Sequence, residues 1–325
     1  MIKVGIVGGA GYTAGELIRL LVNHSKVELN FVYSTSNAGN YIHQVHQDLL
    51  GSTGLKFTST INKHVDVLFL CLGHGNSKKF LEQNEFSPQT KIIDLSNDFR
   101  LNEDAIFQSK EFVYGLPELQ KEKIQKANHI ANPGCFATGI QLGLLPLAKA
   151  GLLNSEVHIN ATTGATGAGV SPGATTHFAW RDNNFSVYKA FTHQHLGEIS
   201  ESLKELQAGF SEELFFIPNR GNFSRGIFAS IYLNYEGSLE AAYELFESYY
   251  KDDVFTHISK SPIHLKQIVN TNNCVIHLEK HKNKLLITSA IDNLLKGASG
   301  QAIENMNLLF GFNQKEGLQL KATSF

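Results

Sequence analysis

Cysteine and arginine are scarce in this sequence. Its 325 residues include three cysteines, Cys71, Cys135 and Cys274, and only five arginines against 23 lysines. The cysteines are too widely spaced for a CxxC metal site, and their odd number does not fit a disulfide framework, so we expect a reducing compartment, the cytoplasm. The net charge of −2 excludes a strongly basic surface for nucleic acid or for an anionic membrane.

Long apolar runs are also missing. No stretch is long enough to span a bilayer, and the first residues predict a strand rather than the basic and apolar succession of a signal peptide. With 42% hydrophobic and 18% charged residues, the composition is that of an ordinary globular protein. The length predicts roughly two domains.

The chain opens with a predicted strand, a glycine turn and a predicted helix. Lys3–Val7 is apolar, and Leu17, Ile18 and Leu21 recur at helical spacing. Glycines in such a turn let the backbone approach a pyrophosphate, which then meets the helix N-terminus. Close packing of a helix on a sheet also needs glycines, but the position at the first βα turn favours a dinucleotide site. The residues of this turn are Gly8, Gly9, Ala10, Gly11, Tyr12 and Thr13.

The second predicted strand, Val27–Tyr33, ends in the hydroxyl side chains of Ser34, Thr35 and Ser36. A carboxylate at this position would bind the ribose diol of NAD. Hydroxyl groups without an acid favour a 2′-phosphate instead, so we expect NADP.

Two further predicted strands end in polar loops. Val65–Leu72 leads into Gly73, and Ile92–Leu95 leads into Ser96 and then Arg100. In open α/β sheets, ligands bind at the carboxyl ends of the strands. Arg100 is therefore a candidate for binding a phosphate or a carboxylate, with an ion pair to a nearby aspartate as the alternative.

Cys135 lies where a predicted strand, Asn128–Ala131, turns into a predicted helix over Ala137–Lys149. The unpaired N–H groups and the dipole of a helix N-terminus can lower the pKa of a thiol from about 8.5 toward neutrality and supply a thiolate. The placement suits a nucleophile. A free cysteine is also an ordinary core residue, which is how we interpret Cys71 and Cys274.

The second half of the chain is richer in predicted strands. Glu156–Ala161 alternates as a half-buried strand and precedes a small-residue loop, Thr162–Gly169, that can act as an anion nest or as a hinge. The polar stretch Thr175–Thr192 is too long for a simple connector and can form a lid.

His193 and His195 precede a predicted helix whose apolar face carries Ile199 and Leu203. Glu198 follows His195 by three residues, so its carboxylate can orient the imidazole, as acid–base catalysis requires. Structural histidines and a metal pair are the alternatives. A metal site needs further ligands at recognisable spacing, and none appears nearby, so we expect no metal.

The remaining segments complete an α/β protein. The predicted strands Phe215–Pro218 and Gly226–Tyr235 flank a loop with two more arginines, Arg220 and Arg225. We expect a Rossmann-type dinucleotide-binding domain and an α+β domain with a mixed or antiparallel sheet. The later elements are a helix over Ser238–Tyr250, a hairpin of Cys274–Leu278 with Leu285–Ala290, and a closing helix through Leu309.

Together these segments make the chain resemble the N-acyl-γ-glutamyl-phosphate reductases, relatives of aspartate-semialdehyde dehydrogenase. The resemblance runs nearly end to end, and several blocks in this order are very unlikely by chance. The blocks that carry it are Gly8 to Leu21, Asp94 to Leu101, Val113 to Glu118, Asn132-Pro133-Gly134-Cys135, Thr163 to Gly169, His193-Gln194-His195 with Glu198-Ile199, and Asp292 to Asn307.

The resemblance implies an NADP-binding domain of residues 1–134 and 297–325 and a catalytic, substrate-binding and oligomerisation domain of residues 135–296. It implies NADPH-dependent reduction of an acyl phosphate to a semialdehyde through a thioester on Cys135, in a homodimer or homotetramer. N-Acetyl-γ-glutamyl phosphate, in arginine biosynthesis, is the substrate that we expect. Neither nucleic acid nor a membrane is an expected partner.

The resemblance also assigns residues. His195 is favoured over His193 as the general acid–base because Glu198 can orient it. Positions near the substrate match Ser96, Arg100, Tyr188, Glu198 and Arg225. Cofactor positions match Gly8, Gly9, Ala10, Gly11, Tyr12, Thr13, Ser34, Ser36, Gly73, Thr163, Gly164, Asn293 and Gly297.

Other functions remain open at this point. The same chemistry could act on N-succinyl-glutamyl phosphate, aspartyl phosphate or an aminoadipyl phosphate. A chain that kept the fold as an NADP-binding sensor is the non-enzyme alternative. The presence of Cys135 with both histidines speaks against a sensor, which has no use for a nucleophile and its base.

Overall fold

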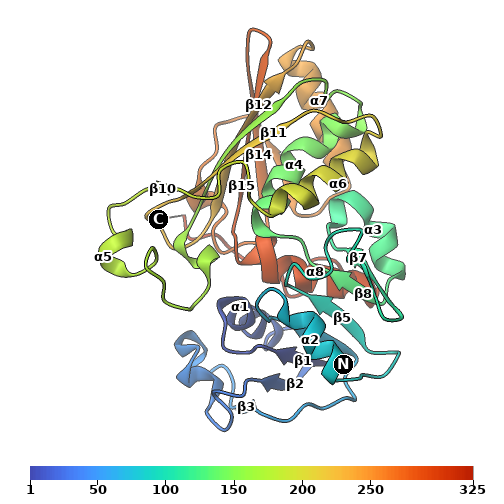
Figure 1. The fold of residues 1–325 in the computed structure, drawn as a ribbon, viewed down its shortest axis with the longest axis vertical. Coiled ribbons are helices and arrows are strands. Elements are labelled where there is room, and N and C mark those ends of the chain that lie inside the picture. The colour runs from blue at the N-terminus through green and yellow to red at the C-terminus, as the bar shows by residue number, and fades with distance from the viewer. Residues whose placement is uncertain (325) are drawn as a thin grey trace. The chain divides into compact units, whose positions relative to one another are not determined.

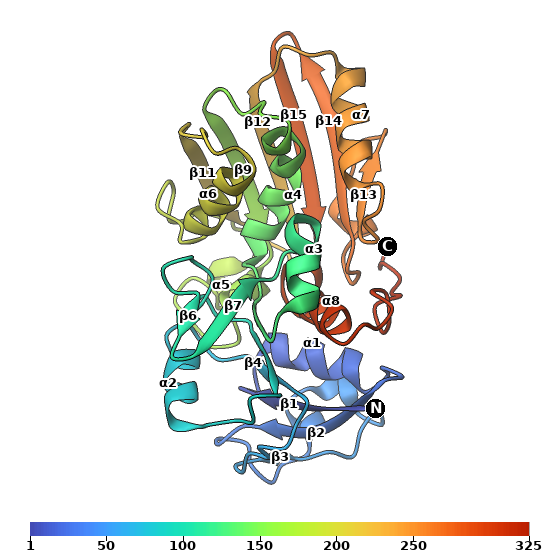
Figure 2. The same cartoon turned by 90° about the vertical axis from the view of Figure 1, so that its right-hand side faces the viewer.

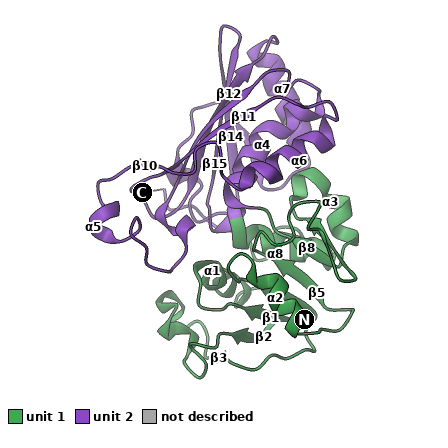
Figure 3. Cartoon of the chain, viewed as in Figure 1, with its two compact units in different colours: residues 1–133, 298–319 green, residues 134–297, 320–325 purple. Residues whose placement is uncertain are grey.

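The computed structural model describes residues 1–324. They form two compact units (Figure 3). Unit 1 comprises Met1–Pro133 and Ala298–Gln319, and unit 2 comprises Gly134–Gly297 and the described residues from Leu320 onward. Among the residues described, none of the helices has the length and apolar composition that crossing a bilayer requires.

Unit 1 is built on one sheet with the strand order β3-β2-β1-β4-β5-β8-β7-β6. All neighbouring strands are parallel except the pair β6 and β7. The chain order reverses between β1 and β4, which is the switch point where open α/β sheets bind ligands. The strands are β1 (Ile2–Val7), β2 (Val27–Tyr33), β3 (Phe57–Thr58), β4 (Val67–Leu70), β5 (Lys91–Asp94), β6 (Ile106–Phe107), β7 (Lys110–Tyr114) and β8 (His129–Ala131).

The helices of unit 1 pack on this sheet through apolar stripes (Figure 1). Leu17, Ile18 and Leu21 of α1 are buried, as their helical spacing predicts. All four residues of β4 are buried too, which is typical of a strand with both faces covered. Helix α8 contacts α1, α3 and β5. The helices are α1 (Tyr12–Leu21), α2 (Asn76–Gln83), α3 (Pro117–Lys126) and α8 (Gly300–Leu309), with short 3₁₀ turns η1 (Ile42–Gln44) and η2 (Gln47–Leu49).

Unit 2 contains a mixed sheet with the order β10-β11-β9-β12-β15-β14-β13. The pairs β9–β11 and β13–β14 are parallel and the others antiparallel. The strands are β9 (Val157–Thr163), β10 (Ser186–Val187), β11 (Leu214–Arg220), β12 (Ile227–Asn234), β13 (Thr256–Ser259), β14 (Cys274–His281) and β15 (Lys284–Ile291). The helices are α4 (Cys135–Lys149), α5 (Phe178–Arg181), α6 (His195–Leu206) and α7 (Leu239–Tyr250), with short turns η3 (Ala165–Ala168), η4 (Leu265–Gln267) and the π-helical η5 (Leu295–Ser299).

Helices α4, α6 and α7 cover one face of the unit 2 sheet (Figure 2). Helix α4 is central, and every residue from Phe136 to Ala148 is buried. Two glycines let it lie close to the strands. A Cβ at Gly143 would be 2.8 Å from Ile231 of β12, and one at Gly139 would be 3.6 Å from Ile291 of β15. This close packing fixes the direction in which the start of α4 points.

The fold class expected from the sequence is confirmed, including the hairpin of β14 with β15. Two strand ends differ from expectation. Strand β9 continues to Thr163, and β11 continues to Arg220, because Asn219 and Arg220 pair with Thr162 and Thr163 of β9. Arg220 is therefore the last residue of a strand and not part of a loop.

Candidate active site

Cys135 is the first residue of α4, as the sequence predicts. Gly134 is the N-cap, and no side chain caps this end of the helix. The N–H groups of the first turn therefore have no partner within the helix, and the positive end of the helix dipole lies at the sulfur-bearing residue. Cys135 is partly buried. This environment favours an anion at its side chain.

Glu198 and His195 of α6 meet the chain immediately before Cys135. The Gly134 N–H donates to Glu198 Oε2 at 2.9 Å, and Glu198 Oε1 lies 3.8 Å from His195 Nε2. A Cβ at position 134 would be 2.4 Å from His195 Nε2, so only glycine admits the imidazole here. His195 therefore sits against the residue that precedes the cysteine, with its carboxylate neighbour in place.

His193 lies beside His195, with the two ring centroids 4.6 Å apart. Its Nδ1 accepts the His195 backbone N–H at 3.2 Å, and its ring packs edge-on to Phe136 and Phe216. Burial lowers the pKa of His193 to about 4; the charge of Lys189 adds to this, and that of Glu198 opposes it. His193 is thus neutral near pH 7. With Nδ1 as acceptor, we assign its proton to Nε2.

Tyr188 belongs to the same cluster. Its ring lies edge-on to His193, with the ring centroids 5.9 Å apart. Burial and the negative charge of Cys135 raise the pKa of Tyr188 to about 12, while Arg220 acts in the opposite direction. The phenol therefore remains protonated and can donate a hydrogen bond.

Gly297 of the π-helical turn η5 packs directly on Cys135. A Cβ at position 297 would be 2.8 Å from the Cys135 Cβ and 3.2 Å from the Asp292 carbonyl oxygen. The Gly297 N–H donates to that same carbonyl at 2.9 Å. The turn that begins at Asp292 thus holds Gly297 against the cysteine.

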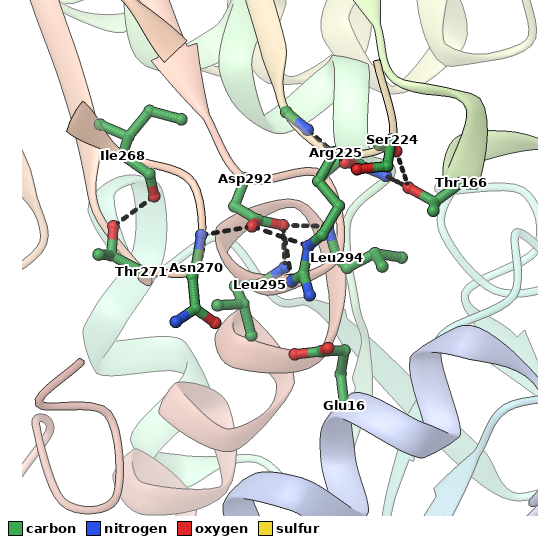
Figure 4. A network of polar contacts seen from close by, with 12 residues as sticks. Glu16, Thr166, Ser224, Arg225, Ile268, Asn270, Thr271, Asp292, Leu294 and Leu295 are labelled. Atoms are coloured by element: carbon green, nitrogen blue, oxygen red, sulfur yellow. Dashed lines mark hydrogen bonds and ion pairs between the residues drawn. The ribbon is translucent and has the colours of Figure 1, made fainter. Parts of the chain in front are cut away.

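Asp292 anchors this turn with its buried carboxylate (Figure 4). Arg225 donates from Nε and from Nη2, both at 3.1 Å. The backbone N–H groups of Asn270, Leu294 and Leu295 donate at 2.7, 2.8 and 3.2 Å. Such a set of donors compensates the cost of burying a charge. Arg225, expected near the substrate, thus directs two of its donors at Asp292.

The small-residue loop after β9 is hydrogen-bonded to the loop between β11 and β12. The N–H groups of Gly164, Ala165 and Thr166 donate to carbonyl oxygens of the segment 223–226, so these three N–H groups do not form an anion nest, one of the two roles that the sequence allows for this loop. Asn293 is hydrogen-bonded to both of these loops. Its Oδ1 accepts from Gly226 N at 2.7 Å, and its Nδ2 donates to Thr166 Oγ1 at 3.0 Å. Thr163 ends β9 with its side chain buried.

The glycine turn of unit 1 connects β1 to α1 at the switch point. Gly8 has φ +83°, and a Cβ there would be 2.5 Å from the Cys71 carbonyl oxygen, so this turn requires glycine. At Gly11, by contrast, an added Cβ would meet nothing closer than 4.0 Å. Gly11 is also the N-cap of α1, with no side-chain cap. An anion can therefore reach the N–H groups of Tyr12 and Thr13.

Ser34 and Ser36 follow β2 at the same edge of the sheet. Asn37 Nδ2 donates to Ser34 Oγ at 3.3 Å and to Ser36 Oγ at 3.1 Å. Among the residues described, no carboxylate stands in this cluster where one would bind a ribose diol. Three polar side chains therefore gather at this edge of the sheet.

The loops after β4 and β5 meet through a buried carboxylate. Asp94 accepts from Ser77 Oγ and Ser96 Oγ, both at 2.6 Å. Burial raises the pKa of Asp94 to about 6, while these hydrogen bonds and the charge of Arg100 oppose the rise. The Ser96 hydroxyl thus donates its hydrogen bond to Asp94. Gly73, expected near the cofactor, begins the loop that leads into α2 and is exposed.

Arg100 is buried and donates to backbone carbonyl oxygens. Its Nε donates to Asn132 O at 2.8 Å, and its Nη2 donates to Leu95 O at 3.0 Å. Both bonds hold the backbone at the carboxyl ends of β5 and β8. Within unit 1, the buried Arg100 side chain thus holds in place the backbone at the carboxyl ends of these strands, the edge at which open α/β sheets bind ligands.

Cys71 and Cys274 differ from Cys135. Burial raises the pKa of the Cys71 thiol to about 12, with a hydrogen bond to Thr13 acting against this. Cys274 is fully buried on the first residue of β14. Neither thiol is poised as a nucleophile, and Cys135 is the cysteine that stands at an uncapped helix N-terminus.

Family models match both halves of the chain. Residues 3–127 match the NAD binding domain of semialdehyde dehydrogenase, and residues 135–293 match its dimerisation domain. With the Rossmann-type strand order, these matches define a nicotinamide-dinucleotide-binding oxidoreductase.

Curated relatives narrow the class. The chain is 62% identical over 325 residues to an N-acetyl-gamma-glutamyl-phosphate reductase of Christiangramia forsetii and 61% identical to one of Flavobacterium johnsoniae, each covering all of both chains. One from Bacteroides thetaiotaomicron is 57% identical, again over both full lengths. The chain therefore belongs to the semialdehyde dehydrogenase family, among the N-acetyl-gamma-glutamyl-phosphate reductases.

Solved structures share the fold at low sequence identity. An aspartate semialdehyde dehydrogenase II of Vibrio cholerae, complexed with ASA, has a TM-score of 0.70 at 14% identity, covering 96% of this chain and 98% of that one. The enzyme of Candida albicans with NADP has a TM-score of 0.67 at 14% identity and covers 95% and 99%.

The contact between Gly297 and Cys135 can be tested directly. Gly297→Ala should slow the alkylation of Cys135 by iodoacetamide several-fold, because the new methyl group must displace the cysteine or shield it. Peptide mass spectrometry measures the rate at Cys135. Gly209→Ala is the matched control, since a Cβ there meets nothing within 4 Å. Equal rates in the two variants would show that Gly297 does not position the cysteine.

Proposed function

We propose that this chain reduces N-acetyl-γ-glutamyl phosphate to the corresponding semialdehyde with NADPH, as a step of arginine biosynthesis. The observation that supports this most is the position of Cys135 at an uncapped helix N-terminus, beside His195 and Glu198. The full-length relatives with this activity in their names support the choice of substrate.

Cys135 is the nucleophile in this proposal. Its thiolate attacks the acyl carbon, the bond from that carbon to the phosphate oxygen breaks, and inorganic phosphate leaves with the electron pair. The product of this step is a thioester on Cys135. The N–H groups of the first turn of α4 stabilise the oxyanion that forms during attack.

The reduced nicotinamide, when bound, supplies the hydride that converts the thioester carbon to the aldehyde level. The remaining steps belong to the chain. His195 gives its proton to the oxygen of the hemithioacetal as that intermediate forms and takes the proton back as the intermediate collapses, and Glu198 orients the imidazole. As the carbon–sulfur bond breaks, Cys135 returns to the thiolate and the aldehyde departs. Tyr188, protonated at neutral pH, can donate a hydrogen bond to the substrate.

The preference for NADP rests on unit 1. Residues 8–13 provide a glycine turn with room at Gly11 for a pyrophosphate, and Ser34 and Ser36 provide hydroxyl groups for a 2′-phosphate. We place Gly73 at the same edge. In unit 2, Gly164 and Asn293 are hydrogen-bonded to other loops of the same unit and Gly297 packs on Cys135. We propose that Asn293 and Gly297 act chiefly by holding the turn against Cys135.

Two features of the substrate, its acyl group and the length of its carbon chain, are decided by experiment. N-Succinyl-glutamyl, aspartyl and aminoadipyl phosphates would undergo the same chemistry at Cys135. An assay of NADPH oxidation with each compound distinguishes them. The N-acetyl compound is expected to show the highest kcat/KM. A higher value with any other compound would reassign the substrate.

We also propose that the reaction takes place in the cytoplasm. A thiolate nucleophile needs a reducing environment, and all three cysteines are free.

The thioester gives the sharpest test of the mechanism. Incubation with acyl phosphate and no NADPH should add the mass of the acyl group to the peptide that contains Cys135, and later addition of NADPH should remove it. Cys135→Ala should abolish both the adduct and turnover while NADP⁺ binding survives. Cys274→Ala is the control, since it removes a core thiol of the same unit and should keep turnover. Full turnover in Cys135→Ala would rule the mechanism out.

The two histidines are separable by substitution. His195→Asn should lower kcat by about 10²- to 10⁴-fold, the usual contribution of a general acid–base. His193→Asn should lower kcat by less, and because the pKa of His193 is about 4, its pH–rate profile between pH 6 and 8 should match that of the wild type. A larger loss in His193→Asn than in His195→Asn would exchange their roles.

We also propose a homodimer or homotetramer that uses the open face of the unit 2 sheet. On this face Tyr232 is 42% exposed, and its ring stacks on His158 at 4.7 Å, next to Phe215. Tyr232→Arg should shift the mass measured by light scattering toward the monomer, because it buries an unpaired charge in the contact. Glu247→Arg, a surface change on α7, should leave the mass unchanged. A wild-type protein that is monomeric at micromolar concentration contradicts the proposal.

A further inference from the structure

Arg220 lies at the carboxyl ends of two parallel strands. It pairs in register with Thr163, the last residue of β9. Side chains alternate along a strand, so Arg220 shares a face with Phe216, four residues earlier. The Phe216 ring contacts Phe136 at 5.2 Å and His193 at 5.4 Å, measured between ring centroids. Arg220 and Thr163 thus belong to the sheet face on which α4 begins.

Tyr188 connects Arg220 to Cys135. The Arg220 guanidinium carbon lies 4.6 Å from the centre of the Tyr188 ring. Tyr188 in turn touches His193, and it is close enough to Cys135 for the charge on the sulfur to act on its phenol. The Tyr188 side chain therefore interacts both with the Arg220 guanidinium and with the Cys135 sulfur.

Polar groups here remain without partners within residues 1–324. The Arg220 Nε–H group is buried and donates to no acceptor within these residues, and Thr163 Oγ1 is likewise buried without a partner. The Thr163 residue is only 1% exposed. Two unsatisfied buried groups on paired residues are costly unless a ligand satisfies them.

The local charge is positive. Arg181 is buried next to Arg220; burial and the charge of Arg220 lower its pKa. Arg181 donates to the Arg220 carbonyl oxygen at 2.7 Å and to Ser186 Oγ at 3.1 Å. Among the described residues, neither guanidinium has a carboxylate partner. Two cations without a counter-charge make this an anion-binding environment.

We propose that Arg220, Thr163 and Tyr188 form an anion subsite beside Cys135 that binds a carboxylate or phosphate group of the substrate. The inference rests on the proposed reduction of an acyl phosphate, and it adds a recognition residue that sequence reasoning did not select. The substrate offers two such groups, the phosphate and the α-carboxylate, and a succinylated substrate offers a third. A guanidinium suits either anion because its two N–H groups match two oxygens.

The reverse reaction separates the sources of the anion. With N-acetylglutamate semialdehyde, inorganic phosphate and NADP⁺ as substrates, each has its own KM. Arg220→Gln should raise the KM of one of them by about 10- to 100-fold, the range of a lost charge-assisted hydrogen bond. A raised KM for phosphate identifies the phosphate, and a raised KM for the semialdehyde identifies a carboxylate. A rise confined to the succinylated semialdehyde identifies the acyl carboxylate.

Controls separate binding from folding. Arg220→Lys keeps the charge without the planar fork and should recover part of the lost affinity. Lys251→Gln removes the same charge from an exposed position and should change no KM. The KM of NADP⁺ and the thermal unfolding of Arg220→Gln should stay as in the wild type. Unchanged KM values in Arg220→Gln for phosphate and for both the acetylated and the succinylated semialdehyde would overturn the inference.

A binding measurement makes the test independent of turnover. Inorganic phosphate or N-acetylglutamate should protect Cys135 of the wild type from iodoacetamide, and Arg220→Gln should weaken this protection by the same factor. Protection with no turnover on any acyl phosphate would retain the subsite and reject the proposed function. Turnover with equal protection in both proteins would retain the function and reject the subsite. Absence of protection in the wild type by either compound would also reject the subsite.

Discussion

The site in unit 2 depends on the contact between Gly134 and His195. Because residue 134 has no side chain, the imidazole packs directly on the backbone that leads into α4. Glu198 then binds the Gly134 N–H with one oxygen and faces His195 with the other. One carboxylate thus contacts both the residue that precedes α4 and the imidazole of His195. It also places a negative charge near the positive end of the α4 dipole.

Much of this could be predicted from the sequence because the signals are local. A strand, a glycine turn and an amphipathic helix are adjacent in the chain, and so are the strand and helix around Cys135. His195 and Glu198 lie three residues apart on one helix, which brings them together without tertiary information. The same spacing makes His195 the favoured general acid–base, because Glu198 can orient it. The tertiary structure gives the two rings different surroundings, since His195 touches Gly134 while His193 packs among aromatic rings.

What the sequence could not predict depends on pairing between distant segments. Arg220 lies in β11 rather than in a loop because β9 supplies a partner for it, and no local pattern shows that register. The Asp292 carboxylate likewise gathers donors from three separated segments. The scarcity of arginine was a useful signal, but it did not distinguish roles. Arg100 donates to backbone carbonyl oxygens, and Arg225 donates to the Asp292 carboxylate. The Nε–H group of Arg220, by contrast, has no acceptor among the described residues.

The Asp292 network has a consequence for how unit 2 assembles. The hydrogen-bond donors to the Asp292 carboxylate come from Arg225, from Asn270 and from the turn after Asp292 itself. All three segments must therefore be in place before the carboxylate has its full set of donors. An intermediate that closed over the carboxylate with one of these segments absent would carry an uncompensated charge in a dry environment, at a cost of several kcal/mol. The three segments are therefore expected to dock in one cooperative step. The Cys135 sulfur, against whose residue this turn packs, would then acquire its final surroundings only once these segments have docked.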